Sequence, residues 1–328
     1  MKTICLDAYK NLYIEGRQGN LSISPCCLIT TRPVDKIDFY NNSYLVETRK
    51  IWNLEKFPDT CSACKQSEEQ TGQSRRLSSN TWYEQNGIFD ESIELVRIDY
   101  WTGDLCNLRC AICGPKFSSA WKEELGLPLE QKKVVVNDTW KNLNLSTIKY
   151  IHFNGGEPLL SKEHVQFLQS IPDKTKVKLF YNTNVTILPK DGLLELWSQF
   201  NLVQIDFSID DLGDRFEYQR FPAKWNDIVK NLQYFRDNCP VNCIFGINTS
   251  LGILNYHNYK NLLAWLKSNF STNRVTDPVE YRTQQTFGIL RMDNVNQRKT
   301  QIVEYLNKLD LSRGTNWKIT FPELVQIL

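Results

Sequence analysis

The sequence has almost no net charge and very few histidines. Its 39 lysines and arginines are balanced by 37 acidic residues, which gives a formal net charge of +2 at pH 7. Proteins that bind nucleic acids or anionic membrane surfaces use a clear excess of basic residues, so this balance argues against both kinds of partner. The histidines, His152, His164 and His257, lie far apart in the sequence and form no metal-ligand pattern.

The sequence also lacks a long apolar run. No stretch approaches the roughly 18 consecutive apolar residues of a membrane-spanning helix. The N-terminal residues, MKTICLDAYK (1–10), include Asp7 and no apolar core, so they do not resemble a secretory signal peptide. We therefore expect a cytoplasmic protein without a membrane segment.

Cysteine, in contrast, is abundant for that compartment. Disulfides are rare in the cytosol, so the 10 cysteines favour metal ligation. They form an N-terminal group within residues 1–64, a triplet within residues 106–113, and a separate pair, Cys239 and Cys243. That pair precedes a predicted strand, which places it at the end of the fold away from the chemistry, so we expect core or near-surface thiols there.

Short β-rich runs alternate with amphipathic stretches from residue 94 onward. The predicted strands are 94–100, 147–153, 176–182, 202–209 and 242–250, with a sixth at 285–292. The predicted helices between them are 161–171, 191–200, 225–238 and 259–270. Such alternation is typical of a parallel sheet with crossover helices. It predicts an α/β fold of the partial (β/α)6, TIM-like barrel kind.

The predicted barrel spans residues 94–292 and is flanked by two smaller parts. Residues 1–93 are polar and rich in turn formers, and they suggest a small cysteine-rich domain. Residues 293–328 form a tail, with a predicted helix at 295–309 and an extended end.

The cysteine triplet follows the first predicted barrel strand. Cys106, Cys110 and Cys113 have C-x3-C-x2-C spacing, and no fourth cysteine or histidine follows nearby. A structural zinc site is normally closed by four ligands, whereas a four-iron cluster takes one thiolate per iron. Three thiolates therefore leave one iron open to a small molecule, at a strand end where barrel enzymes place their chemistry. The alternatives are a zinc site with a distant fourth ligand, or thiols that happen to be close in sequence.

This spacing after the first strand resembles the signature of the radical S-adenosylmethionine (radical SAM) enzymes. The resemblance implies a [4Fe-4S] cluster on Cys106, Cys110 and Cys113 whose open iron is chelated by S-adenosylmethionine (SAM). In that family the reduced cluster cleaves SAM to a 5′-deoxyadenosyl radical, which abstracts hydrogen from the substrate. Ile112 stands where the family usually has an aromatic or apolar residue that packs against adenine, with plain core packing as the alternative.

Later strand ends carry further segments that resemble this family. FNGGEPLL (153–160) is similar to its GGEP motif: Gly155 and Gly156 would let the backbone approach a ligand, and carbonyls there with the nearby Glu157 carboxylate would meet the ammonium group of SAM. An ordinary strand-to-helix turn is the alternative. Ser208 matches a serine that meets the ribose, and Arg220 an arginine that meets the SAM carboxylate, unless it is an exposed ion-paired side chain. The other candidate cofactor contacts at strand ends are Thr183, Asn184, Asp210 and Asn248.

The N-terminal cysteines resemble a different ligand set. Cys5 and Cys26, followed by the close pair Cys61 and Cys64, are similar to the ligands of a twitch domain, the short form of the SPASM domain. Such domains hold an auxiliary [4Fe-4S] cluster. Cys27 is an alternative to Cys26, and zinc, which four thiolates satisfy equally well, is the alternative to iron.

The residues after that pair strengthen the resemblance. CKQSEEQTGQSRR (64–76), with Glu69, Gly72, Ser74 and Arg75, is similar to a stretch in uncharacterised bacterial and phage radical proteins. The twitch domain usually follows the barrel, whereas here it would precede it.

These features predict a radical SAM enzyme that acts on a peptide or a small molecule. An electron donor such as flavodoxin or ferredoxin would reduce the cluster. The alternative is a non-catalytic iron–sulfur or zinc-binding interaction protein, which would need neither the GGEP segment nor a cavity shaped for a cofactor.

Overall fold

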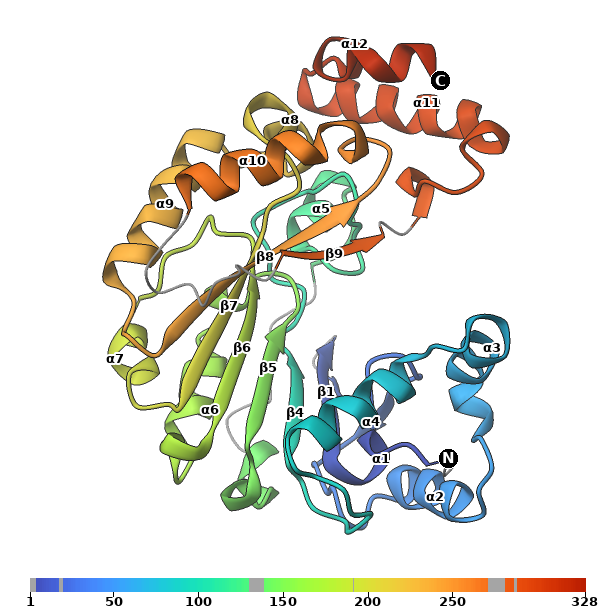
Figure 1. Ribbon diagram of the computed structural model, residues 1–328, viewed down its shortest axis with the longest axis vertical. Helices are drawn as coiled ribbons and strands as arrows, with labels where there is room; N and C mark the ends of the chain where they lie inside the picture. Colours follow the sequence, from blue (N-terminus) through green and yellow to red (C-terminus); the bar gives the residue numbers. More distant parts are fainter. Residues whose placement is uncertain (1–3, 18–19, 130–138, 191, 271–280, 286–287) are drawn as a thin grey trace.

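The computed structural model describes the chain except for residues 1–3, 18–19, 130–138, 191, 271–280 and 286–287 (Figure 1). Its described strands form a single sheet with the order β3-β2-β1-β4-β5-β6-β7-β8-β9. In the run β1-β4-β5-β6-β7-β8-β9 each strand is parallel to its neighbours. On the other side of β1, β2 and β3 extend the sheet with antiparallel pairing. The sheet is open and mixed, and its parallel part from β4 to β8 is the one that the sequence predicts.

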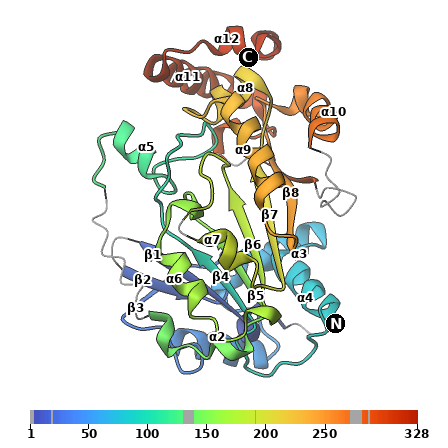
Figure 2. The same ribbon diagram turned by 90° about the vertical axis from the view of Figure 1, so that its left-hand side faces the viewer.

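The parallel strands alternate with helices along the chain. The strands of the predicted barrel region are β4 (Arg97–Trp101), β5 (Tyr150–Asn154), β6 (Lys178–Thr183), β7 (Leu202–Ser208), β8 (Cys243–Leu251) and β9 (Tyr281–Gln285). The helices of this region are α5 (Ser119–Glu124), α6 (Glu163–Gln169), α7 (Leu193–Trp197), α8 (Gly213–Gln219), α9 (Trp225–Asn238) and α10 (Tyr259–Asn269). Figures 1 and 2 show α6, α7, α9 and α10 on one face of the sheet.

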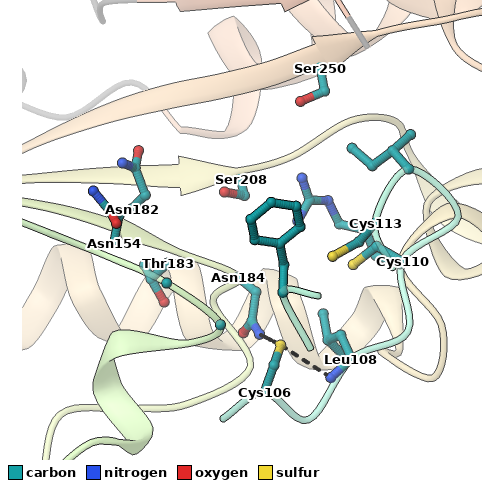
Figure 3. Close-up of a pocket in the computed structure, with 15 residues that line it drawn as sticks. Cys106, Leu108, Cys110, Cys113, Asn154, Asn182, Thr183, Asn184, Ser208 and Ser250 are labelled. Carbon is teal, nitrogen blue, oxygen red and sulfur yellow. Dashed lines mark hydrogen bonds between the residues drawn. The ribbon is translucent and has the colours of Figure 1, made fainter. Parts of the chain in front are cut away.

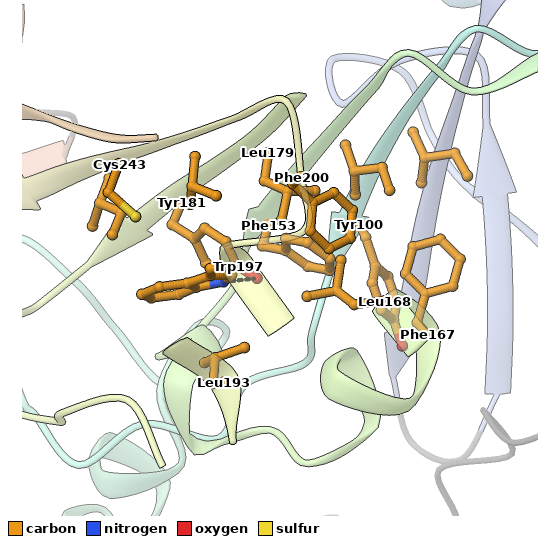
Figure 4. Packing of buried hydrophobic residues seen from close by; sticks show 14 of the residues in the cluster. Tyr100, Phe153, Phe167, Leu168, Leu179, Tyr181, Leu193, Trp197, Phe200 and Cys243 are labelled. Carbon is orange, nitrogen blue, oxygen red and sulfur yellow. Dashed lines mark hydrogen bonds between the residues drawn. The ribbon is translucent and has the colours of Figure 1, made fainter. Parts of the chain in front are cut away.

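Alternation along each strand separates the two faces of the sheet. On β7, Val203, Ile205 and Phe207 belong to the main apolar core, whereas Ser208 lines a cavity on the other side. Figure 4 shows the aromatic part of this core, where side chains of the strands pack against those of α6 and α7. Burying each large apolar side chain contributes about 1.5–3 kcal/mol, so this face anchors the sheet to its helices and leaves the concave face for polar groups.

The strand and helix predictions are confirmed over most of this region. β4 to β8 overlap the five predicted strands, and α9 spans the predicted 225–238. The sixth strand was expected too late in the chain: β9 is Tyr281–Gln285, residues 286–287 lie outside the described part, and Gly288–Leu290 forms a 3-10 turn. The apolar residues of that turn, Ile289 and Leu290, pack in the C-terminal core instead of pairing in the sheet.

The prediction of an extended C-terminal end is wrong. The long helix α11 (Val295–Arg313) is followed by α12 (Trp317–Thr320) and the 3-10 helix η8 (Pro322–Gln326). Trp317, Phe321 and Leu324 are all buried in one apolar cluster with α11. Their spacing of four and three residues is the helical period, which the aromatic and β-branched composition of the segment obscured.

The N-terminal part is more ordered than its polar composition suggested. It contains α1 (Asp7–Lys10), α2 (Ser43–Asn53), α3 (Ser62–Thr71) and α4 (Arg75–Gln85), with the strands β1 (Asn11–Arg17), β2 (Asn20–Ser24) and β3 (Arg32–Val34). β1 pairs in parallel with β4, with Tyr13 opposite Asp99. The predicted domain boundary at residue 93 therefore falls between two neighbouring strands of one sheet. No described helix is long and apolar enough to cross a membrane.

Candidate cofactor site

A cavity of about 280 Å³ lies at the C-terminal ends of β5 to β8 (Figure 3). Figure 3 shows the sulfurs of Cys106, Cys110 and Cys113 on the loop after β4, across this space from the strand ends. The lining residues are Cys106, Leu108, Cys110, Ile112, Cys113, Phe117, Asn154, Gly155, Gly156, Asn182, Thr183, Asn184, Ser208, Arg220 and Ser250. The structure thus brings ten of the thirteen residues predicted for the cluster and its cofactor into one wall; Glu157, Asp210 and Asn248 lie outside it.

The loop that carries the cysteine triplet is held at several backbone positions. The amide of Arg109 donates to the Phe221 carbonyl at 2.7 Å, and that of Ala111 donates to the Gln219 carbonyl at 2.7 Å. The Tyr305 hydroxyl of α11 donates to the Ala111 carbonyl at 2.6 Å. The end of α8 and the C-terminal helix therefore fix the loop before any metal binds.

The three thiols are half-buried, and the Arg220 guanidinium lies near two of them. Burial raises the pKa of Cys106 to about 11 and also raises the pKa of Cys110 and Cys113. The Arg220 guanidinium acts in the opposite direction on Cys110 and Cys113. Because metal ligands must be thiolates, binding would release protons, and Arg220 would offset part of the resulting negative charge.

The two glycines of the GGEP segment pack directly against the loop before the triplet. The Gly156 amide donates to the Gly103 carbonyl and the Glu157 amide to the Leu105 carbonyl, both at 2.8 Å. A Cβ on Gly155, which has φ of +136°, would lie 2.7 Å from the Gly103 oxygen, and one on Gly156 would lie 2.4 Å from the Leu105 oxygen. These glycines are required by the close approach of two backbone segments as well as by their place in the cavity wall.

Glu157 lies behind the wall instead of in it. Its carboxylate is 1% exposed and accepts from the Leu159 amide at 3.1 Å, the Thr183 hydroxyl at 2.9 Å and the Asn184 amide at 2.7 Å. Burial raises the pKa of Glu157 to about 7, although these donors act in the opposite direction. The side chain joins the GGEP turn to the end of β6 and so positions Thr183 and Asn184 in the cavity.

Replacing Glu157 with glutamine should weaken this junction and leave the triplet able to hold metal. The new amide group must face donors, so the free energy of unfolding should fall by about 1–3 kcal/mol. The folded-state pKa is raised, so the native state binds the proton more tightly than the unfolded chain does. The advantage of wild type over Glu157→Gln should therefore shrink as the pH rises from about 5 to about 7.

Urea unfolding across that pH range, with iron analysis of each sample, measures both effects. The exposed Glu69→Gln variant is the control and should match wild type. An unchanged free energy of unfolding, or loss of iron from Glu157→Gln, would contradict the role assigned to this carboxylate.

Arg220 is ion-paired but buried, which excludes the exposed arginine weighed from the sequence. Its Nε and Nη2 lie 2.8 and 2.7 Å from Asp210 Oδ2, and its side chain lines the cavity. Asp210 Oδ1 accepts from the Ser250 amide at 2.8 Å. Asp210 therefore orients Arg220 from behind the wall, and the Asn248 side chain donates to Asn182 Oδ1 of the wall at 3.4 Å.

The sequence of the cavity region identifies its family. Residues 102–266, half of the chain, match the sequence profile of the Radical SAM superfamily. The chain belongs to the radical SAM superfamily. The matched region includes the cysteine triplet and all of the cavity wall.

Curated relatives of this radical SAM protein match it only in part. GTP 3′,8-cyclase of Clostridium botulinum is 29% identical over 133 residues, which is 40% of this chain and 40% of the relative. GTP 3′,8-cyclase of Alkaliphilus oremlandii is 29% identical over 145 residues, 44% of this chain and 40% of the relative. The chain therefore spans about two fifths of the length of these relatives.

Two solved structures that match this chain share little sequence with it. Native anSMEcpe with bound AdoMet has a TM-score of 0.43 and 13% identity, over 67% of this chain and 62% of that one. SuiB of Streptococcus suis bound to S-adenosylmethionine has a TM-score of 0.41 and 13% identity, over 90% of this chain and 69% of that one.

The concave face of this radical SAM sheet holds a polar network that sequence reasoning missed. His152 is half-buried with Nδ1 3.5 Å from Asp99 Oδ1 and Nε2 2.7 Å from Asn182 Nδ2. Burial alone would raise the pKa of Asp99, but Arg97 and His152 hold it well below its usual range. Asn182 lines the cavity, so the network runs from these charged groups to the cofactor site.

Five lining residues were absent from the prediction: Leu108, Phe117, Asn154, Asn182 and Ser250. For Asn182 a signal existed. It alternates with Leu179 and Tyr181, which are buried in the main core, so it had to face the concave side. Leu108 and Phe117 lie on the irregular loop around the triplet, where no periodicity assigns a direction.

Three of the four predicted N-terminal ligands meet in a separate apolar cluster. Cys26 and Cys61 are buried in one apolar cluster with Trp52, against which Cys5 packs. Burial raises the pKa of Cys5, Cys26 and Cys61, and that of Cys61 reaches about 11. Cys5 is close enough to Cys26 and Cys61 for their charges to interact, as Cys61 is to Cys64.

Cys27 shares charged neighbours with Cys26 but is more exposed. It is exposed, and the charged groups that act on its pKa are Arg75, Asp99, Asp7 and Arg97. Among the residues that the structure describes, no three His, Cys, Asp or Glu side chains already converge on one metal-ion position. The assignment of ligands in this group stays a prediction, and the geometry favours Cys26 over Cys27.

Proposed function

We propose that this chain holds a [4Fe-4S] cluster on Cys106, Cys110 and Cys113 and binds SAM in the adjacent cavity, to abstract hydrogen from a peptide or small-molecule substrate. The observation that carries the proposal is that three half-buried thiols, the GGEP backbone and the polar ends of β5 to β7 line a single cavity. When bound, the cluster and SAM would supply the 5′-deoxyadenosyl radical.

Different residues of the cavity wall would bind different groups of SAM. The backbone at Gly155 and Gly156 would meet the ammonium group, and Arg220, oriented by Asp210, is the cation available for the carboxylate. Ser208 would meet the ribose, and Ile112 with Phe117 offers the apolar surface for the adenine. The triplet leaves no thiolate for the fourth iron, which is where SAM would bind.

The substrate would bind on the concave face beside this cavity. Asn154 and Asn182 line the cavity with neutral amides, and His152 and Asp99 continue the polar surface toward the N-terminal part. Such a surface suits a polar peptide segment or a small polar molecule. The electron would come from a donor such as flavodoxin or ferredoxin.

The N-terminal cysteines would hold an auxiliary [4Fe-4S] cluster of the twitch or SPASM kind. Cys5, Cys26, Cys61 and Cys64 supply four thiols, enough to leave no iron open. Such a cluster cannot bind SAM through an iron and would instead exchange electrons or stabilise the N-terminal part. Zinc on the same thiols is the competing possibility.

Metal analysis of single variants should assign the N-terminal ligands. In protein that lacks the triplet cysteines, about four irons should remain per chain. Adding Cys26→Ala should remove them, because this thiol lies with Cys5 and Cys61, whereas Cys27→Ala should keep them. About one zinc in place of iron would exclude the auxiliary cluster, and the reverse result for the two variants would exchange their roles.

Electron paramagnetic resonance tests whether the triplet cluster binds SAM. We expect the spectrum of dithionite-reduced protein to change when SAM is added to a Cys26→Ala variant, in which only the triplet holds iron. The change should disappear in Arg220→Gln at the same SAM concentration. A spectrum that SAM does not alter in either protein would contradict the open iron site.

A further inference from the structure

Arg75 lies between the N-terminal cysteines and the concave face of the sheet. It is the first residue of α4, whose N-cap, Ser74, accepts from the Leu77 amide at 3.1 Å. Its Nη2 is 3.3 Å from Asp99 Oδ2, and its Nε is 3.6 Å from Asp7 Oδ2. Burial acts to lower the pKa of Arg75, but the charges of Asp7, Cys27, Asp99 and Cys26, in that order, raise it.

Hydrogen bonds to the Glu68 carboxylate fix the turn that precedes Arg75. Glu68 accepts from the Ser74 hydroxyl at 2.6 Å and from Arg76 Nε and Nη2 at 2.9 and 2.6 Å. Gly72, with φ of +71°, ends α3 in the left-handed conformation that this turn requires. Glu68, and not the Glu69 singled out in the sequence, is therefore the carboxylate of this segment that holds the turn.

In this arrangement one buried donor of Arg75, its Nε, has no acceptor among the described residues. Nε is buried and has no hydrogen-bond partner among the residues that the structure describes, because 3.6 Å from Asp7 is too long for a hydrogen bond. Asp7 already accepts from the Ser79 hydroxyl at 2.9 Å and the Tyr83 hydroxyl at 3.1 Å. A buried N–H of this kind is costly unless an acceptor fills its position, and the nearby thiol group is where a sulfur acceptor would come from.

We propose that Arg75 donates an N–H···S hydrogen bond from Nε to a sulfur of the N-terminal metal centre and offsets the charge of its thiolates, and so raises the reduction potential of that centre. This inference rests on the proposed N-terminal site. Hydrogen bonds to the sulfurs and the net charge around them are the main protein contributions to the potential of an iron–sulfur cluster.

The Nη2 end of the Arg75 guanidinium connects to the SAM cavity through other polar residues. Nη2 pairs with Asp99, which also contacts His152, and His152 reaches Asn182 in the wall of the SAM cavity. Arg75 is therefore a positioning residue that joins the N-terminal centre to the polar face where the substrate would bind. A change of charge at that centre would act first on Arg75 and on its ion-pair partner Asp99.

A redox titration followed by electron paramagnetic resonance tests the inference in protein that lacks the triplet cysteines, so that only the N-terminal centre contributes. Arg75→Gln should keep its iron and titrate at a clearly lower potential than the parent. Arg75→Lys retains the charge without Nε and should fall between the two. Arg236→Gln, which removes an arginine paired with Asp237 on α9, should match the parent.

Each outcome decides one of the two claims. An unchanged potential in iron-loaded Arg75→Gln overturns the inference; should that variant lose its metal, an unchanged potential in Arg75→Lys does so. If the centre contains zinc, the auxiliary cluster fails while the hydrogen bond remains testable after cobalt(II) substitution. The thiolate-to-cobalt absorption band should then shift in Arg75→Gln, and an unshifted band overturns the role of Arg75.

Discussion

Replacing Cys106, Cys110 and Cys113 together with alanine should remove about four irons per chain. The three thiols line one cavity, and the loop that carries them is anchored by α8 and α11 independently of metal. The variant should therefore fold, keep the iron of the N-terminal centre and lose the ability to bind SAM. Iron analysis and calorimetric titration with SAM measure both losses.

Cys27→Ala is the matched control for this result. It removes an exposed thiol that lies apart from the triplet and from Cys5 and Cys61. Its iron content and SAM affinity should equal those of wild type. A triplet variant that retained all of its iron would show that these thiols ligate no cluster.

Gly156→Ala should abolish SAM binding or reduce it by far more than tenfold. The new Cβ would lie 2.4 Å from the Leu105 carbonyl oxygen and 2.8 Å from the Asp104 carbonyl carbon, which are backbone atoms that cannot turn aside. The GGEP turn and the loop before Cys106 must then separate. Overpacking of this kind typically costs about 1–3 kcal/mol, and here the strain falls on the cavity wall itself.

Gly114→Ala offers a control within the same loop region. No atom lies within 4 Å of the Cβ that it would introduce, and its φ is outside the left-handed range. It should bind SAM as wild type does in calorimetric titration. Equal affinities for Gly156→Ala and wild type would mean that the close approach of these two segments is not needed for the site.

The sequence predicted the strands whose apolar and polar residues alternate in step with the buried and open faces of the sheet. The strands from β4 to β8 alternate apolar and polar residues, because one face packs on helices and the other lines a cavity. The positions of the triplet and of the GGEP segment at strand ends were enough to place their residues in one wall.

The N-terminal helices escaped prediction because their stability is not local. α3 buries none of its residues, and its end is fixed by Gly72 and by the contacts of Glu68 with Ser74 and Arg76. Contacts between side chains six and eight residues apart have no periodic signature. β1 was missed for a similar reason, since its partner β4 lies more than eighty residues further along the chain.

Two of the candidate cofactor contacts lie behind the cavity wall. Glu157 and Asp210 follow strand ends, and a carboxylate there was expected to face the ligand. The structure turns both inward, Glu157 to donors from Thr183 and Asn184 and Asp210 to Arg220. Which of two neighbouring polar residues lines a cavity depends on hydrogen-bond partners that only the folded chain brings together.

The most direct test of the account is the formation of 5′-deoxyadenosine from SAM. Anaerobically reconstituted protein is incubated with dithionite and SAM, and the product is quantified by chromatography. Wild type and the Cys26→Ala variant should both form 5′-deoxyadenosine, and the variant without Cys106, Cys110 and Cys113 should form none. Equal formation with and without the triplet, or none from wild type loaded with its iron, would contradict the account.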